Sequence, residues 1–292
     1  MTRTYRYKVV DVFSSCALLG NPVAVVLDAE GLPTEAMQAI ARWTNLSETT
    51  FVFPPTVPEA DYRLRIFTPQ SELPFAGHPT LGTAHAILEE RDIRRPVIHL
   101  VQECELGLVD VTVEEGDPDG RVTLGLPAAH FKNLQNDDIS ELQSILNYEF
   151  KDVATPAVVN VGAIWVVAQL DSAAAVLDLS PDFARMAEFE RRLGVTGVTV
   201  FGHHDQGDAE IEVRTFAPSC GVEEDPVCGS GNGSVAVFRR ERSLIPSQGA
   251  EYVATQGRRV GRDGRIHVRV DADGAVHLGG SCITTLHGTL AL

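Results

Sequence analysis

An internal repeat dominates this sequence: the same motifs occur in the same order in the two halves of the chain. In the first half, RIFTP at residues 65–69 is followed by PFAGH at residues 74–78. In the second half, RTFAP at 214–218 is followed by PVCGS at 226–230, with a short insertion between the two motifs. Such a chain is expected to fold into two units of similar structure.

The repeat extends upstream through one strand and one helix in each half. Apolar segments at Asn21–Val26 and Ala163–Val167 are typical of buried strands. Amphipathic helical patterns then open at Thr34 and Ser180, and we expect these residues to be the helix N-caps, with Pro181 in the first helical position. Four matching elements in one order support a true repeat.

Each half is predicted to contain strands, an amphipathic helix, more strands, a glycine-containing loop and a second helix, at 80–90 and 233–240. This order predicts an α+β fold with two quasi-equivalent domains. A length of 292 residues suits two domains of about 100–150 residues each. We place the domains at residues 1–128 and 129–292, with the last strand free to return to the first domain.

Both loops place a glycine at the start of the second helix, Gly77 in the first half and Gly229 in the second. A helix N-terminus presents unpaired N–H groups and a partial positive charge, so it favours an anion, and glycine lets a ligand approach the backbone. If a pseudo-twofold axis relates the halves, the helix ends face each other and a small carboxylate is the natural ligand. The alternative is that each loop is a plain strand-to-helix turn.

Composition argues against several other classes of protein. The formal net charge is −16, and the sequence shows no basic face of the kind that a nucleic-acid binder needs. No apolar run suits a transmembrane helix and the polar N-terminus does not resemble a signal peptide, so a cytoplasmic protein without a membrane partner is expected. Five widely spaced cysteines do not suggest a disulfide framework. Zinc motifs, a P-loop and GxGxxG are missing, and neither a metal nor a cofactor is expected.

Further motifs make the sequence similar to one known family. Besides the repeated blocks, these motifs are Asp11-Val-Phe13, Gly20-Asn21-Pro22, Leu46–Val52 and Asp225-Pro226-Val227. With them the chain resembles the PhzF family, which shares its fold with diaminopimelate epimerase and proline racemase. The resemblance implies two epimerase-like domains, each a barrel-like sheet around a central helix, with the active site in the interdomain cleft. It also implies a cofactor-independent isomerase, phenazine-biosynthesis-like, and a homodimer.

The resemblance implies roles for individual residues as well. Glu48 matches the catalytic acid/base of the family, and His78, Asp225 and Ser230 match residues that line the site and assist substrate binding or proton transfer. The amides that match the family's carboxylate cradle are those of Gly77, His78, Gly229 and Ser230. Considered alone, His78 could be a structural histidine and Asp225 a turn or cap residue.

A carboxylate such as Glu48 suits a reaction that moves a proton between carbons, because it can take the proton and return it if burial raises its pKa towards neutrality. Glu48 lies between an amphipathic helix and the apolar strand Phe51–Phe53, so partial burial is expected. Its counterpart in the repeat is roughly Thr196, which cannot act as a base, so the chemistry is expected to be one-sided. The alternative is a surface acid near a helix end, which the helix dipole would disfavour by about 0.3–1 kcal/mol.

Cys228 departs from the family pattern, in which a threonine usually precedes the glycine of the second loop. In the racemase relatives, a cysteine directly before the glycine of each loop forms the acid/base pair, and here the first loop has Ala76 at that place. A helix N-terminus favours a thiolate. Cys228 could therefore be a neutral packing replacement, a second acid/base partner of Glu48, or a nucleophile in different chemistry.

The leading prediction for function is an isomerase that shifts a double bond, or inverts a carbon, next to the carboxylate of a small amino-acid-derived acid in secondary metabolism such as antibiotic biosynthesis. The second is an amino-acid epimerase or racemase assisted by Cys228. The third is a hydrolase, because Ser230, His78 and Asp225 supply the residue types of a triad, although no GxSxG motif is present. The fourth is a non-catalytic protein that binds small acids.

Overall fold

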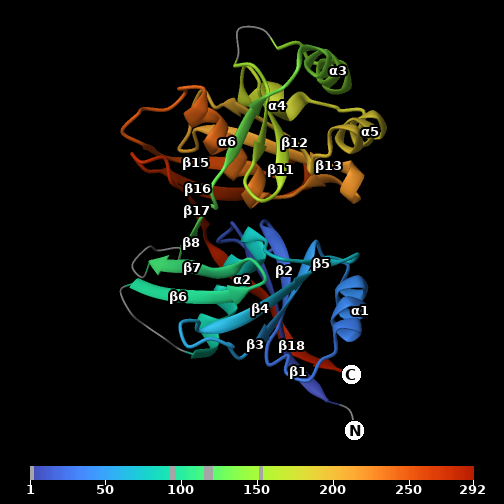
Figure 1. Ribbon diagram of the computed structural model, residues 1–292, viewed down its shortest axis with the longest axis vertical. Helices are drawn as coiled ribbons and strands as arrows, with labels where there is room; N and C mark the ends of the chain where they lie inside the picture. The colour runs from blue at the N-terminus through green and yellow to red at the C-terminus, as the bar shows by residue number, and fades with distance from the viewer. Residues whose placement is uncertain (1–2, 92–96, 115–120, 151–153) are drawn as a thin grey trace. The chain divides into compact units, whose positions relative to one another are not determined.

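The chain divides into two units (Figure 1). The computed structural model describes residues 3–91, 97–114, 121–150 and 154–292. Unit 1 comprises Met1–Leu124 and Gly279–Leu292, and unit 2 comprises Gly125–Leu278. The sequence placed this division at 128/129 and allowed the last strand to return. That strand, β18 (Cys282–Ala291), pairs antiparallel with β1 (Thr4–Val12) of unit 1.

Within its described residues, unit 1 contains strands and two helices. Its further strands are β2 (Asn21–Val26), β3 (Glu48–Phe53), β4 (Tyr62–Phe67), β5 (Glu72–Leu73), β6 (Val97–Cys104), β7 (Gly107–Glu114) and β8 (Val122–Gly125), the last of which reaches the boundary with unit 2. Its helices are α1 (Thr34–Thr44) and α2 (Gly77–Arg91).

Unit 2 contains the other strands and four α-helices among its described residues. Its strands are β9 (His130–Asn133), β10 (Ala157–Asn160), β11 (Ile164–Gln169), β12 (Gly197–His203), β13 (Ile211–Ala217), β14 (Val222–Asp225), β15 (Ala250–Gln256), β16 (Gly264–Val270) and β17 (Val276–Gly280), which leads back to unit 1. Its helices are α3 (Asn136–Leu146), α4 (Ala173–Asp178), α5 (Phe183–Leu193) and α6 (Gly229–Glu241), with short 3-10 turns at Pro218–Cys220 and Arg258–Val260.

Strand pairing repeats from one unit to the other. In unit 1, β1 pairs antiparallel with β2, β2 parallel with β3, β3 antiparallel with β4, β4 parallel with β6, and β6 antiparallel with β7. The same alternation occurs in unit 2. There, β10 pairs antiparallel with β11, β11 parallel with β12, β12 antiparallel with β13, β13 parallel with β15, and β15 antiparallel with β16. The sequence repeat is therefore a repeat of structure, and the predicted α+β fold is confirmed.

Each unit holds one helix against the inner face of its sheet (Figure 1). Helix α2 contacts β1, β2, β3 and β18, and α6 contacts β9, β10, β11, β12 and β16. A Cβ at Gly82 in α2 would lie 2.5 Å from Val23 Cγ1, so only glycine allows this approach of helix to strand. Both helices begin earlier than the sequence predicted, at Gly77 and Gly229.

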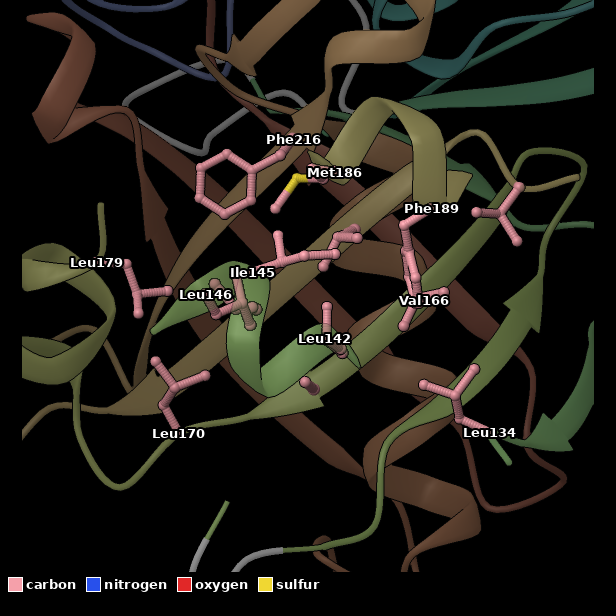
Figure 2. Packing of buried hydrophobic residues seen from close by; sticks show 14 of the residues in the cluster. Leu134, Leu142, Ile145, Leu146, Val166, Leu170, Leu179, Met186, Phe189 and Phe216 are labelled. Atoms are coloured by element: carbon pink, nitrogen blue, oxygen red, sulfur yellow. The ribbon is translucent and has the colours of Figure 1, made fainter. Parts of the chain in front are cut away.

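The remaining longer helices cover the outer face of each sheet with apolar side chains. In unit 1, Met37 of α1 belongs to a buried cluster with Phe51 and Phe67. In unit 2, Figure 2 shows Ile145 of α3 and Phe189 of α5 in one such cluster with strand residues. Full burial of such a side chain stabilises a fold by about 1.5–3 kcal/mol. Within the described ranges, no helix combines the length and the apolar character needed to cross a membrane.

The predicted helix caps were wrong in both halves. Helix α1 begins at Thr34, and its N-cap position is occupied by Pro33 without a side-chain hydrogen bond. Helix α5 is capped by Asp182 and not by Ser180, because the Asp182 carboxylate accepts the amide of Arg185 at 3.1 Å. The N-cap is the residue whose side chain accepts a hydrogen bond from a free N–H group of the first turn. The sequence pattern did not fix which residue this is to better than two positions.

Candidate active site

The part of the candidate site that unit 1 contains is built around Glu48 and His78. Glu48 is the first residue of β3, and His78 is the second residue of α2. Glu48 Oε2 lies 3.4 Å from His78 Nε2, and the two side chains are 16% and 8% exposed. The structure thus brings together two residues that the sequence assigned to the site from separate motifs.

Two buried threonines tie β3 to α2 close to this contact. Thr50 Oγ1 lies 2.9 Å from Thr83 Oγ1 and donates to the carbonyl of Ala24 in β2 at 3.2 Å. Both threonine side chains are fully buried. An unsatisfied buried hydroxyl would cost about 1–3 kcal/mol, so the pair resists separation of strand and helix. The link therefore holds Glu48 and His78 at their mutual distance.

The imidazole of His78 is neutral at neutral pH. Burial lowers the pKa of His78 from 6.5 to about 3. The Glu48 carboxylate acts in the opposite direction, because a nearby anion favours an imidazolium, but desolvation is the larger effect for a side chain this buried. The contact is therefore one between a carboxyl group and a neutral imidazole, and it is not an ion pair.

The first turn of α2 offers backbone amides to an anion. Among the described residues, the N–H groups of Gly77 and His78 meet no protein acceptor, and Pro79 has no N–H. The next amide, of Thr80, donates to the carbonyl of Ala76 at 3.3 Å. A Cβ at Gly77 would meet nothing within 4 Å, so the backbone there borders open space. The geometry suits a carboxylate at this helix end.

The second group of site residues lies at the start of α6 in unit 2, where Cys228 is the N-cap. Its Sγ accepts a hydrogen bond from the amide of Gly231 at 3.3 Å and lies 3.6 Å from Ser230 Oγ. In the part of the chain that the structure describes, the amides of Gly229 and Ser230 have no protein acceptor. The sulfur thus satisfies one amide of the first turn and leaves two for a ligand.

Asp225 lies just before this turn, at the end of β14. Its Oδ1 accepts the amide of Val227 at 3.1 Å. Burial raises the pKa of Asp225 from 3.8 to about 6, although hydrogen bonds from the Val227 amide and the Cys228 thiol act against burial and the charge of Glu224 acts with it. Part of the residue stays accessible to solvent. A carboxyl group with such a pKa can both take and return a proton near neutral pH.

Ser230 is oriented by Trp165, the second residue of β11. Trp165 Nε1 donates to Ser230 Oγ at 3.1 Å, and the indole is almost fully buried. The other neighbour of this hydroxyl is Cys228 Sγ. Within unit 2 the described partners of Ser230 therefore include no histidine, so neither unit by itself assembles the hydrolase triad considered from the sequence.

Strand register identifies the counterpart of Glu48 in unit 2. Strand β12 begins at Gly197 as β3 begins at Glu48, and β12 pairs with β13 in the register in which β3 pairs with β4. Glu48 thus matches Gly197, one residue away from the predicted Thr196. A Cβ at Gly197 would overlap the carbonyl oxygen of Phe216, so no side chain fits there. Unit 2 has no carboxylate at this position, as we expected from the sequence.

Two glycines of the unit 2 loop have a packing role that sequence reasoning missed. A Cβ at Gly231 would lie 2.6 Å from Thr215 Oγ1, and one at Gly233 would overlap Leu126. These glycines let α6 approach the sheet, whereas Gly77 of unit 1 faces open space. Trp165 was also missed, and its position in a repeated strand was the available signal. The buried threonines of unit 1 carry no such signal, because threonine is common in strands.

The fold and the side chains at these two helix ends define a class of protein, the two-unit isomerases with an epimerase-like fold. The family model described as phenazine biosynthesis-like protein (PhzC-PhzF) matches residues 10–288, and the chain belongs to this family.

Relatives cover nearly the whole chain. Over 273 residues it is 36% identical to trans-2,3-dihydro-3-hydroxyanthranilate isomerase from Pseudomonas aeruginosa, with 92% of each chain covered. Over 295 residues it is 41% identical to antisense-enhancing sequence 1 from Schizosaccharomyces pombe, with 97% of this chain and 98% of that protein covered. The crystal structure of a PhzF-family phenazine biosynthesis protein from Bacillus anthracis superposes with a TM-score of 0.87 at 23% identity, covering 99% and 100% of the two chains. The protein is an isomerase of this family.

Proposed function

We propose that this isomerase moves a proton between positions next to the carboxylate of a small amino-acid-derived acid, and that Glu48 takes and returns the proton. The observation that carries the proposal is the 3.4 Å contact of Glu48 with His78, beside the open amides at the start of α2. In support, a relative at 36% identity is named for isomerising trans-2,3-dihydro-3-hydroxyanthranilate, an amino-substituted carboxylic acid.

Each step of the proposed reaction uses a group of unit 1. The amides of Gly77 and His78, at the positive end of α2, hold the substrate carboxylate. Glu48 removes the proton from a neighbouring carbon, and the electron pair left behind is delocalised towards the carboxylate, where the helix end stabilises the increased charge. Glu48 then returns the proton. Delivery to a different carbon shifts the double bond, so atoms and charge balance without another reactant.

A second candidate is a two-base epimerase, favoured by the geometry of Cys228. Its sulfur accepts the Gly231 amide and lies near the carboxyl group of Asp225, which has a pKa of about 6. Such a pair can share and release a proton. Delivery of that proton to the opposite face of the carbon that Glu48 deprotonated would invert the centre. That Asp225, Cys228, Gly229 and Ser230 act on the same substrate as Glu48 stays a prediction of the sequence.

The test is solvent deuterium incorporation into a panel that contains trans-2,3-dihydro-3-hydroxyanthranilate and both enantiomers of several amino acids. In D₂O, a proton shift places deuterium on a new carbon, whereas epimerisation places it on the inverted carbon. Incorporation should be lost in Glu48→Gln. Turnover that persists undiminished in this variant, or binding of panel acids without either exchange or conversion, would contradict the proposal.

Single replacements in unit 2 then separate the two candidates. Cys228→Ala should abolish turnover if the thiol is the second acid/base, and should leave most of it if Glu48 acts alone. Cys220→Ala is the matched control, because Cys220 is an exposed free cysteine. Asp225→Asn is expected to follow Cys228→Ala in the first case.

A further inference from the structure

Gln256, the last residue of β15, binds both ends of the loop that carries Asp225 and Cys228. Its Oε1 accepts the backbone amide of Cys228 at 3.2 Å and Asn232 Nδ2 at 2.8 Å. Its Nε2 donates to the backbone carbonyl of Asp225 at 3.0 Å. The side chain is fully buried, so a single amide group links the end of β14, the cap of α6 and the first turn of that helix.

The orientation of this amide is fixed by its partners. Both groups facing Oε1 are N–H donors, and the group facing Nε2 is a carbonyl acceptor. A flipped amide would set donor against donor and acceptor against acceptor. Asn232 strengthens the arrangement, because its Nδ2 also donates to the Cys228 carbonyl at 3.0 Å. The cap residue is thus held at both its N–H and its C=O.

The chain around Gln256 leaves the loop little room to shift. Gly257, with φ of +102°, lies so close that a Cβ there would be 2.5 Å from the carbonyl oxygen of Pro226. A Cβ at Gly264 would overlap the side chain of Val227. The loop is therefore in van der Waals contact with β15 and β16 on one side, and the Gln256 hydrogen bonds set its position along them.

We propose that Gln256 is a positioning residue of the isomerase, which holds the Asp225–Cys228 loop so that the Cys228 sulfur stays at the start of α6 beside the Asp225 carboxyl group. It acts through these two residues, because its own polar atoms are all engaged with the loop and with Asn232. The effect on turnover rests on the proposed function, whereas the effect on the loop does not.

The test replaces Gln256 by Met, which keeps the volume and removes all three hydrogen bonds. In a background with Cys16, Cys104 and Cys220 changed to Ser, iodoacetamide labelling is followed by peptide mass spectrometry at Cys228 and Cys282. Cys228 is buried, so its alkylation reports opening of the loop. Cys282, in unit 1, is the internal reference. The expected result is at least a tenfold faster alkylation of Cys228 with the Cys282 rate unchanged.

Gln102→Met is the matched control. Gln102 is also fully buried in its unit, and its side chain bonds to Tyr62 and Thr80 instead of the loop. This control should leave the Cys228 alkylation rate unchanged. An unchanged rate at Cys228 in Gln256→Met, or equal acceleration at Cys228 and Cys282, would overturn the positioning role. If Gln256→Met fails to fold, Gln256→Glu is measured instead. It should also accelerate alkylation of Cys228, because a carboxylate oxygen then faces the carbonyl oxygen of Asp225 in place of the Nε2 donor.

Turnover supplies the second readout. If Cys228→Ala or Asp225→Asn lowers turnover of the substrate that the deuterium panel identifies, Gln256→Met should lower kcat at least tenfold and change KM less than threefold, since it acts only through these two residues. In that case, unchanged kcat alongside an opened loop would overturn the positioning role in catalysis. Failure of the proposed function itself is recognised separately, because it would appear as deuterium exchange that Glu48→Gln does not abolish.

Discussion

Glu48 and His78 are held 3.4 Å apart, Oε2 to Nε2, although Glu48 begins a strand and His78 lies in the first turn of a helix. The link between Thr50 and Thr83 joins the same strand to the same helix. The neutral state of His78 means that this contact needs no buried ion pair, whose desolvation would cost several kcal/mol per ion. Glu48 therefore faces a polar side chain that carries no charge near neutral pH.

Replacing His78 by Asn should reduce the acid sensitivity of the fold. The folded pKa of His78 is about 3 and its ordinary value is 6.5, so the unfolded chain binds the extra proton between these pH values. Stability therefore falls as the pH drops through this window, by up to about 1.4 kcal/mol per pH unit from this group. Urea unfolding at pH 7 and pH 5 measures the slope. An identical slope in the variant would contradict this account, and His99→Asn, at an exposed site, is the control.

Protonation of Asp225 should make the fold more stable as the pH is lowered, which is the opposite of the effect of His78. Its folded pKa of about 6 lies above its ordinary 3.8, so the folded chain binds the extra proton between these values. This contribution to stability is fully present below pH 3.8 and is lost as the pH rises through 6. Relative to Asp225→Asn, the unmodified protein should gain stability when the pH is lowered from 7 to 4. If the urea midpoint changed by the same amount between pH 7 and pH 4 in both proteins, the pKa of the Asp225 carboxyl group would not be raised in the fold.

Trp165→Phe should destabilise the protein by about 0.5–1.5 kcal/mol, because it removes the N–H that donates to Ser230. Trp43 is 77% exposed, and Trp43→Phe should change stability by less than about 0.5 kcal/mol. Chemical denaturation of both variants makes the comparison. Equal effects of the two replacements would refute an orienting role for Trp165.

Two glycines should respond differently to a single added methyl group. Gly77→Ala should leave stability nearly unchanged, because its Cβ enters open space, but should raise KM by occupying the place of the substrate carboxylate. Gly197→Ala should cost about 1–3 kcal/mol, because its Cβ overlaps the Phe216 carbonyl. Thermal unfolding and steady-state kinetics of both variants test this. A Gly77→Ala enzyme with unchanged KM would remove the predicted carboxylate cradle from this helix end.

Local motifs made much of the fold predictable. The alternation of strands and helices and the glycine at each inner helix are short-range patterns, so the repeat of the two units could be recognised from residues alone. The two site residues of unit 1 could be predicted for the same reason, because Glu48 and His78 each lie within a distinctive local motif. Their mutual distance was not predictable, because it depends on the packing of β3 against α2.

Other parts of the site depend on tertiary contacts that leave no local pattern. The true cap of α5 and the counterpart of Glu48 were displaced by one or two residues, because loop lengths shift register and only hydrogen bonding and strand pairing fix it. Trp165 and Gln256 reach the start of α6 from strands distant in sequence. Nothing in the residues flanking Gln256 indicates that its amide holds the loop of Asp225 and Cys228.

The proposed mechanism requires that Glu48 carry the proton. Solvent deuterium incorporation by Glu48→Gln tests it most directly, with Glu35→Gln, at an exposed acid of α1, as the control. General acid–base catalysis contributes about 10²–10⁴-fold, so we expect a loss of this size in Glu48→Gln with an unchanged unfolding midpoint, and a rate within twofold of the parent in Glu35→Gln. Glu48→Gln that exchanged deuterium at the parent rate would contradict it.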